Sequence, residues 1–421
     1  MGKACSRYLF VVEKAAILLL LIYPTLMLTV KGGMNGAFLL MLLLAFAVWL
    51  VRPAGISAVK WQREWKAYFV AMAALSAAIF ISQSYHHNYH AHPHDAATRY
   101  WLAIPVFLLL LRLRLNVLTV LQFAFPAAAI TGFLLAKDLG AGRSGLGTMD
   151  LIRFGNFELI LGVLSLFSID WFGRDRLLVR LMKLLGFAAG VAASVASGSR
   201  GGWLAIPVFI TIFFYFKMVR ISLKMITASI IAAILFLTIA YFASATFHQR
   251  VNALANDAAA YSQSNRDTSS GIRWQLYCAA ADIFLRHPVF GVGPEGFAQQ
   301  MKPMMEAGKI TPAAAELGRG EAHNDILSKT AGMGVFGLMA ILAIYFVPLR
   351  LFWQAAKSPS GQVKRAGVLG LTFVSGFFVF GLTVEILNLT MSVAFFSFTV
   401  AVLLATCYNI NHDEQITVPQ S

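Results

Sequence analysis

Long apolar runs alternate with short polar stretches along most of the chain. A transmembrane helix needs about 20 mostly apolar residues, with a range of roughly 17–25. By that measure the candidate spans lie at 12–30, 35–51, 67–84, 98–111, 115–136, 156–172, 181–197, 202–217, 222–245, 331–349, 366–384 and 387–408. The pattern therefore predicts an all-α polytopic membrane protein with about 12 transmembrane helices.

Composition supports this class and excludes two others. Hydrophobic residues make up 58% and charged residues 13% of the 421 residues, whereas a soluble domain carries about 25% charged residues. The formal charge of +15 lies mostly in short basic clusters between apolar runs, which indicates contact with membrane lipids rather than nucleic acid. The three cysteines are scattered and indicate neither a disulfide framework nor a thiolate metal site.

The basic residues also predict an orientation. The N-terminus and alternate loops hold 19 Lys and Arg residues, whereas the short loops of the other set hold six. Basic loops stay in the cytoplasm, so both termini are expected there. The chain is thus expected to divide into nine helices within 1–245, an extracytoplasmic loop domain at 246–330, three helices within 331–408 and a cytoplasmic tail at 409–421.

The 246–330 segment is the extramembrane part long enough to fold by itself. Its pattern predicts a helix at 249–262, a turn or cap at 265–271, an amphipathic helix at 272–286, a Pro/Gly turn at 287–297 and a short helix at 311–322. It contains eight basic and eight acidic residues. Because the charges balance, any anion binding there must come from particular arginines.

Arg200 stands in the sequence SGSRGGW, at the expected outer end of a span that runs inward. That helix end carries partial positive charge, and Gly198, Gly201 and Gly202 leave backbone N–H groups uncovered. Arginine also matches phosphate oxygens with two parallel hydrogen bonds. The segment is therefore a candidate phosphate site. The alternative is an arginine that simply extends to the membrane surface.

Arg273 opens the expected amphipathic helix of the loop, with Trp274 and Tyr277 nearby. A second cation is what a pyrophosphate would need. The alternative is a solvated helix face, or an ion pair with Asp267 or Glu295. Weaker candidates of the same kind are Arg266, Arg286 and Arg319.

His323 lies at the outer end of the tenth expected span. A helix N-terminus disfavours the imidazolium, and a neutral imidazole can take a proton from a hydroxyl. Asn324 and Asp325 could cap the helix or orient the ring. The alternative is an ordinary interfacial histidine without a chemical role.

Five histidines, namely His86, His87, His90, His92 and His94, form a tract that suits Zn²⁺ or Ni²⁺. Such a tract is more often an exposed low-complexity loop. Sequence patterns for nucleotide binding, for a Cys-x-x-Cys pair and for a zinc protease are all absent from the chain.

Three segments resemble the signatures of the O-antigen ligase superfamily: SGSRGGWLA (197–205), HPVFGVGPEGF (287–297) and HNDILSKTAGMGVFGL (323–338). Members are bacterial inner-membrane proteins with many spans and one large periplasmic loop, a layout like the one predicted here. In the second half of the chain the likeness lies in motifs, and in the first half it lies in hydropathy.

The resemblance implies a glycosyltransferase that moves O-antigen polysaccharide from undecaprenyl pyrophosphate onto lipid A–core in lipopolysaccharide biosynthesis. It implies that Arg200 and Arg273 contact the pyrophosphate of the donor, and that His323 activates the acceptor hydroxyl. It also implies an inverting transfer on the periplasmic side, without a metal or other cofactor. Two cations can supply the charge stabilisation that Mg²⁺ would otherwise give to a leaving pyrophosphate.

Two other functions stay open. O-antigen polymerases and other oligosaccharide transferases of the superfamily use the same donor with a different acceptor. Protein O-oligosaccharyltransferases usually carry a further periplasmic domain after the last spans, which the short tail here does not suggest. A transporter is the alternative of a different class, and it usually needs carboxylates in mid-span. The acids within the expected spans are few and lie near span ends: Glu13, Glu158, Asp170 and Glu385.

Overall fold

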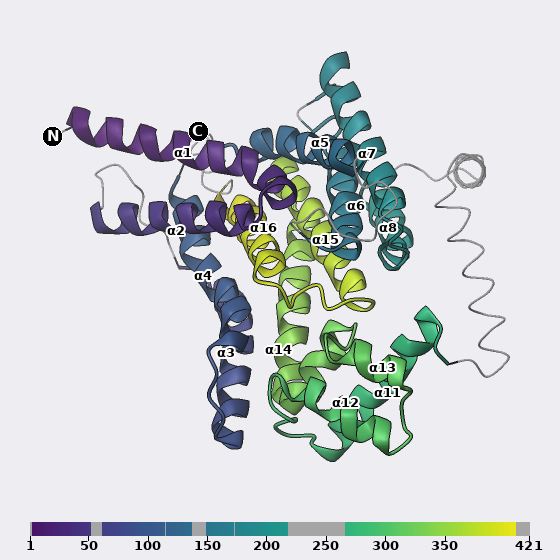
Figure 1. Cartoon of the computed structure of the whole chain (residues 1–421). Coiled ribbons are helices and arrows are strands. Elements are labelled where there is room, and N and C mark those ends of the chain that lie inside the picture. The colour runs from purple at the N-terminus through teal and green to yellow at the C-terminus, as the bar shows by residue number, and fades with distance from the viewer. Residues whose placement is uncertain are drawn as a thin grey trace, which may run out of the picture.

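A computed structural model describes residues 2–51, 61–113, 115–136, 149–171, 173–217 and 266–409. All regular elements within these ranges are helices (Figure 1). They are α1 (Gly2–Thr29), α2 (Gly33–Val51), α3 (Glu64–His86), α4 (His92–Arg112), α5 (Val117–Ala136), α6 (Leu151–Phe167), α7 (Leu177–Ala196), η1 (Gly201–Ala205), α8 (Ile206–Lys217), α11 (Ser269–Arg286), α12 (Gly296–Glu306), α13 (Pro312–Gly318), α14 (Asp325–Ala356), α15 (Gly361–Gly381) and α16 (Thr390–Asn409).

Eight of the described helices are long and apolar enough to cross a membrane: α1, α2, α3, α5, α7, α14, α15 and α16. The chain is therefore a polytopic membrane protein, as predicted. Eleven of the 12 predicted spans coincide with described helices, although α4, α6 and the η1–α8 pair are shorter or less apolar than the eight. The predicted span at 222–245 and the predicted helix at 249–262 lie outside the described residues.

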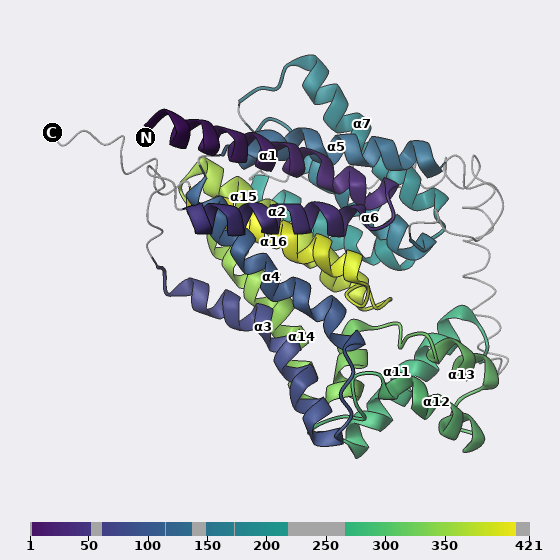
Figure 2. The same cartoon turned by 60° about the vertical axis from the view of Figure 1, so that its left-hand side comes forward.

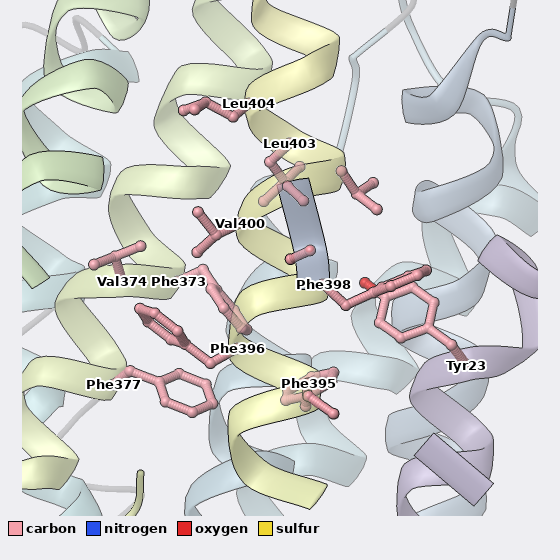
Figure 3. Close-up of a cluster of buried hydrophobic side chains, with 14 of the residues drawn as sticks. Tyr23, Phe373, Val374, Phe377, Phe395, Phe396, Phe398, Val400, Leu403 and Leu404 are labelled. Atoms are coloured by element: carbon pink, nitrogen blue, oxygen red, sulfur yellow. The ribbon is translucent and has the colours of Figure 1, made fainter. Parts of the chain in front are cut away.

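Aromatic side chains fill the centre of the bundle, where α15, α16 and α1 meet (Figure 3). The rings of Phe373 and Phe377 lie 5.5 and 6.1 Å from that of Phe395. Tyr23 of α1 approaches Phe398 of α16 to 4.8 Å. Since lipid tails are as apolar as these side chains, close packing rather than the hydrophobic effect holds such helices together. This packing fixes both helices that flank residues 382–389, here called the 382–389 turn.

Helices α11–α13 lie beyond one end of the bundle, beside the N-terminal end of α14 (Figures 1 and 2). Thr268 caps α11 by accepting a hydrogen bond from Gly271 N at 3.1 Å, which confirms the predicted cap at 265–271. The predicted amphipathic helix is also confirmed, and the predicted helix at 311–322 is shorter, ending at Gly318. The buried side chains between these helices include Leu276, Ala280, Ile283, Phe297 and Met301.

The turn before α12 is clasped to α14 through the backbone. Gly334 has φ 59° and ψ −143°, so the helical hydrogen-bond ladder of α14 is interrupted there. Val335 N donates to Pro288 O at 2.8 Å, and Val292 N donates to Ala331 O at 3.1 Å. A Cβ at Gly334 would lie 2.4 Å from the carbonyl carbon of Val289. The glycines of the 287–297 turn and of α14 thus let the backbones of these two segments form direct hydrogen bonds.

The histidine tract contacts the same turn. His92 Nδ1 lies 2.7 Å from Glu295 Oε1, and His86 Nε2 lies 3.1 Å from Gly291 O. His94 contacts Gln83 within its own hairpin at 3.0 Å. In the part of the chain that the structure describes, no three His, Cys, Asp or Glu side chains gather as metal ligands would. The tract therefore joins the α3–α4 hairpin to the turn before α12.

Segments predicted to lie on the same side of the membrane gather at one end of the bundle. Within the connection from α6 to α7, Lys183 donates to Ser168 O at 2.7 Å and to Asp175 at 2.9 Å. A cavity of 290 Å³ at the same end is lined by the end of α6, by α8, and by Lys364 and Arg365 of α15. The 382–389 turn and α11–α13 lie toward the other end (Figure 2). This grouping agrees with the alternation of basic loops; the membrane orientation itself stays a prediction.

One expectation about acidic residues is wrong. Helix α6 begins at Leu151 rather than at residue 156, so Glu158 lies near its middle. The side chain is buried against Gly132 of α5, and neither carboxyl oxygen has a hydrogen-bond partner among the described residues. The scarcity of mid-span carboxylates is therefore a weaker argument against a transporter than the sequence alone indicates.

We expect Gly334→Ala to lower the melting temperature of the detergent-solubilised protein. Backbone angles that only glycine adopts readily cost another residue about 1–3 kcal/mol, and the new Cβ would also displace the turn at Val289. Thermal unfolding followed by size-exclusion chromatography measures the effect. Gly36→Ala in α2 is the matched control, because its Cβ would meet nothing within 4 Å. Equal melting temperatures for the two variants would contradict the clasp.

Candidate active site

The 382–389 turn is the meeting point of three distant segments of the chain. The Tyr277 hydroxyl of α11 lies 2.9 Å from Leu382 O, and Asn324 Nδ2 donates to the same oxygen at 3.1 Å. Gly201, next to Arg200, packs so closely on Thr383 that a Cβ there would lie 2.5 Å from its hydroxyl oxygen. The backbones that carry Arg200, Arg273 and His323 therefore adjoin one short turn.

His323 directly precedes the N-cap of α14. Asn324 accepts a hydrogen bond from Leu327 N at 3.0 Å, so it caps the helix as expected. Asp325 does not orient the ring, because its carboxylate accepts from the Tyr345 hydroxyl at 2.8 Å and from Leu387 N. His323 has φ 55°, and its side chain is buried, with 6% of the residue exposed. This left-handed conformation is uncommon outside glycine, although histidine adopts it more readily than most residues.

A carboxylate that the sequence did not single out lies against the ring. His323 Nδ1 is 2.8 Å from Glu321 Oε1, a contact that is close but poorly aligned for a hydrogen bond. The other oxygen of Glu321 accepts from Arg153 at 2.9 Å. Arg153 also contacts Asp150 at 2.6 Å and is 8% exposed. A row of charges, in which Arg153 is buried and Glu321 half-buried, thus runs from α6 to the imidazole.

The pKa values of two neighbouring carboxyl groups, Glu321 and Glu385, are shifted in opposite directions. Burial would raise the pKa of Glu321, but its contact with His323 and the charge of Arg153 outweigh burial, so the pKa is lowered. Burial raises the pKa of Glu385, and Lys329 offsets only part of that effect. Glu385 accepts a hydrogen bond from Ala322 N. The carboxyl group beside His323 is therefore the one whose pKa is lowered.

The second ring nitrogen of His323 is differently placed. Nε2 is buried, and no described residue makes a hydrogen bond with it. A buried polar atom without a protein partner is uncommon and calls for a ligand or water. In its neutral form, the ring can therefore face Glu321 with Nδ1 and accept a proton from a substrate at Nε2.

Arg200 precedes η1 and is half-buried. It makes no hydrogen bond or ion pair through its side chain with the residues that the structure describes. The glycines beside it serve close packing: a Cβ at Gly202 would lie 2.2 Å from Asn156 Oδ1 of α6. The number of glycines suggested a loop with uncovered backbone N–H groups for a phosphate, but Gly201 and Gly202 pack against neighbouring side chains. No described residue neutralises the guanidinium of Arg200.

Arg273 lies one helical turn before Tyr277, on the same side of α11. Burial raises the pKa of the Tyr277 hydroxyl, and the nearby charge of Arg273 lowers it, with burial the stronger effect. Within the described ranges no ion pair joins Arg273 to an acid. Glu295, one expected partner, contacts His92 instead. The weaker candidates Arg286 and Arg319 are engaged with Asp282 and Glu316 on their own helices.

A cavity of 490 Å³ lies on another side of Glu321. Its lining includes Glu321, Ser328, Lys329, Glu385 and Asn388, but not His323. Glu321 thus borders this cavity and also contacts the histidine ring.

Residues 185–342 match the sequence model of the O-antigen ligase family. An uncharacterized protein of Haemophilus influenzae is 27% identical over 288 residues, which cover 66% of this chain and 71% of that protein. The O-antigen ligase of Escherichia coli is 30% identical over 153 residues, or 36% of this chain and 34% of the ligase. The resemblance drawn from the three motifs is thereby confirmed. The stretch that matches the O-antigen ligase family, residues 185–342, contains Arg200, Arg273 and His323.

Proposed function

We propose that this protein transfers a glycan from a polyprenyl pyrophosphate to the hydroxyl of an acceptor, and that it is an O-antigen ligase. The observation that supports this most strongly is the grouping at the 382–389 turn. Two arginines without ion pairs among the described residues and a buried histidine with a free Nε2 adjoin it. Cations for the leaving group and a base for the attacking hydroxyl are the two parts that such a transfer needs.

In this proposal Arg200 and Arg273 hold the pyrophosphate of undecaprenyl-linked O-antigen. Each charge-assisted hydrogen bond contributes about 1.5–3 kcal/mol. The cations also stabilise the negative charge that develops as the carbon–oxygen bond to pyrophosphate breaks. The donor enters the site sideways from the outer leaflet, and its polyprenyl chain stays in the bilayer.

His323 acts on the acceptor. Its Nε2 takes the proton of one hydroxyl of lipid A–core, and the oxygen attacks the anomeric carbon from the face opposite the pyrophosphate. In-line attack of this kind inverts the anomeric configuration. Placing the site on the periplasmic face follows from the predicted orientation of α11–α13.

His323→Ala is expected to lower the transfer rate by about 10²–10⁴-fold, the usual contribution of a general base. Donor binding should stay within about twofold of wild type. The measurement is turnover of purified protein in nanodiscs with lipid-linked donor and lipid A–core, together with donor titration. His287→Ala, an exposed histidine at the end of α11, is the matched control. Near-normal turnover of the His323 variant would remove the base assignment.

Arg200→Ala and Arg273→Ala are each expected to weaken donor binding or slow transfer by about 10–100-fold, as 1.5–3 kcal/mol per lost contact requires. Arg286→Ala is the matched control, because this arginine lies on α11 but pairs with Asp282. Donor affinity and kcat are measured for each variant. Unchanged values for both site variants would exclude a pyrophosphate clamp at this place.

Deletion of the gene distinguishes acceptors. A ligase-deficient strain is expected to lose the whole O-antigen ladder from lipopolysaccharide gels while long chains accumulate on the lipid carrier. Core that carries a single repeat would instead identify a polymerase, whose acceptor is another lipid-linked repeat. An unchanged ladder would contradict both assignments unless a second gene restores it, which a double deletion tests.

A further inference from the structure

A row of charged side chains, Glu321, Arg153 and Asp150, leads away from His323. Glu321 Oε1 lies 2.8 Å from His323 Nδ1, and Glu321 Oε2 lies 2.9 Å from Arg153. Arg153 is held in turn by Asp150, which caps α6, and by Glu385 O at 2.8 Å. Two of these links are local, between Asp150 and Arg153 and between Glu321 and His323, whereas Arg153 joins Glu321 across 168 positions and Glu385 across 232.

We propose that Glu321 is a positioning residue for His323, with Arg153 as the group that holds Glu321 in place. The inference rests on the proposed function, because it concerns how the histidine acts as a base. A carboxylate at Nδ1 selects the tautomer in which Nδ1 carries the proton and Nε2 is free to accept another. It also offsets the positive charge that the ring gains when it takes the proton.

The ionic state of Glu321 fits this role. Because contacts with His323 and Arg153 outweigh the effect of burial, the carboxyl group is an anion at neutral pH. Glu385 instead accepts a hydrogen bond from Ala322 N, and its pKa is raised. Of these two carboxyl groups, only Glu321 touches the ring.

The step balances without a further reactant. The acceptor O–H bond breaks and an Nε2–H bond forms, while the new carbon–oxygen bond forms and the bond to pyrophosphate breaks. The electron pair of that bond leaves with the pyrophosphate. His323 becomes a cation between the Glu321 anion and the product, and it later returns its proton to water. Glu321 stays ionised throughout.

The cavity beside Glu321 makes a sharp test possible. Removal of the carboxylate in Glu321→Ala would leave a gap that adjoins a cavity of 490 Å³, large enough for formate to enter. We expect this variant to lose about 10²-fold or more in kcat, with KM and donor affinity within about twofold of wild type. Sodium formate should restore part of kcat in a saturable manner, and sodium chloride at equal ionic strength should not.

Glu321→Gln keeps the volume but removes the charge. Its kcat should fall by at least about tenfold, and formate should not restore it, because the amide occupies the site. Glu316→Ala, which removes an exposed carboxylate paired with Arg319, controls for the loss of a charge nearby. Melting temperatures of all variants are recorded. If Glu321→Ala does not fold, the kcat of Glu321→Gln decides alone.

Wild-type kcat in Glu321→Gln would overturn the proposal, and so would a loss confined to KM or donor affinity. A failure of formate to act on folded, inactive Glu321→Ala would also count against it, since a purely structural role predicts that result. The proposed function is judged separately, by whether wild type transfers and His323→Ala does not. Wild type without transfer would exclude the proposed function itself.

Discussion

A buried guanidinium governs how this site is built. Arg153 is 8% exposed, and an arginine cannot shed its proton to avoid the cost of burial. Its donors are therefore costly to bury without acceptors. The two terminal nitrogens find acceptors in Asp150 at the start of α6, in Glu321 just before His323, and in the backbone of the 382–389 turn, whereas Nε has no hydrogen-bond partner among the described residues. Satisfying one charge thus fixes the spatial relation of three segments, and removing one partner of such a group costs about 3–5 kcal/mol.

Once these segments are fixed, the other contacts follow at short range. The 382–389 turn presents Leu382 O to Tyr277 and Asn324 and presents Thr383 to Gly201. The backbones at Arg200 and Arg273 are positioned by the contacts of Gly201 and Tyr277 with this turn, so the two arginine side chains are not needed for that positioning. Arg153 is neutralised by its partners, whereas Arg200 and Arg273 form no ion pair with the described residues, which is what the proposed binding of a pyrophosphate leaving group requires.

The sequence predicted the parts of the protein that depend on local patterns. Apolar run length located the described spans, and the stripe through Leu276, Ala280 and Ile283 located α11, because both signals arise within a few helical turns. The helix starts were less well predicted, and the missed start of α6 hid the central place of Glu158. Pairings between distant residues were not predictable in this way. Arg153 and Glu321 are 168 positions apart, and in the sequence both looked like ordinary loop charges.

A local signal for Glu321 did exist, since a carboxylate two residues from a histidine can reach its ring when the backbone turns back between them. The positive φ of His323 provides that turn. For the histidine tract, composition alone suggested a function that the contacts do not support. Its spacing suits a metal, but the side chains contact the turn before α12, with His92 beside Glu295 and His86 beside Gly291 O.

The position of the 382–389 turn along the chain has a consequence for biosynthesis. A ribosome delivers Arg153, Arg200, Arg273 and His323 in that order, yet each depends on, or adjoins, a turn that is made after all of them. Until α15 and α16 have entered the membrane, the buried charge of Arg153 lacks one of its acceptors. A half-made chain would therefore hold its histidine and arginines without order among them. The site would therefore be assembled in one late step, when α15 and α16 have entered the membrane.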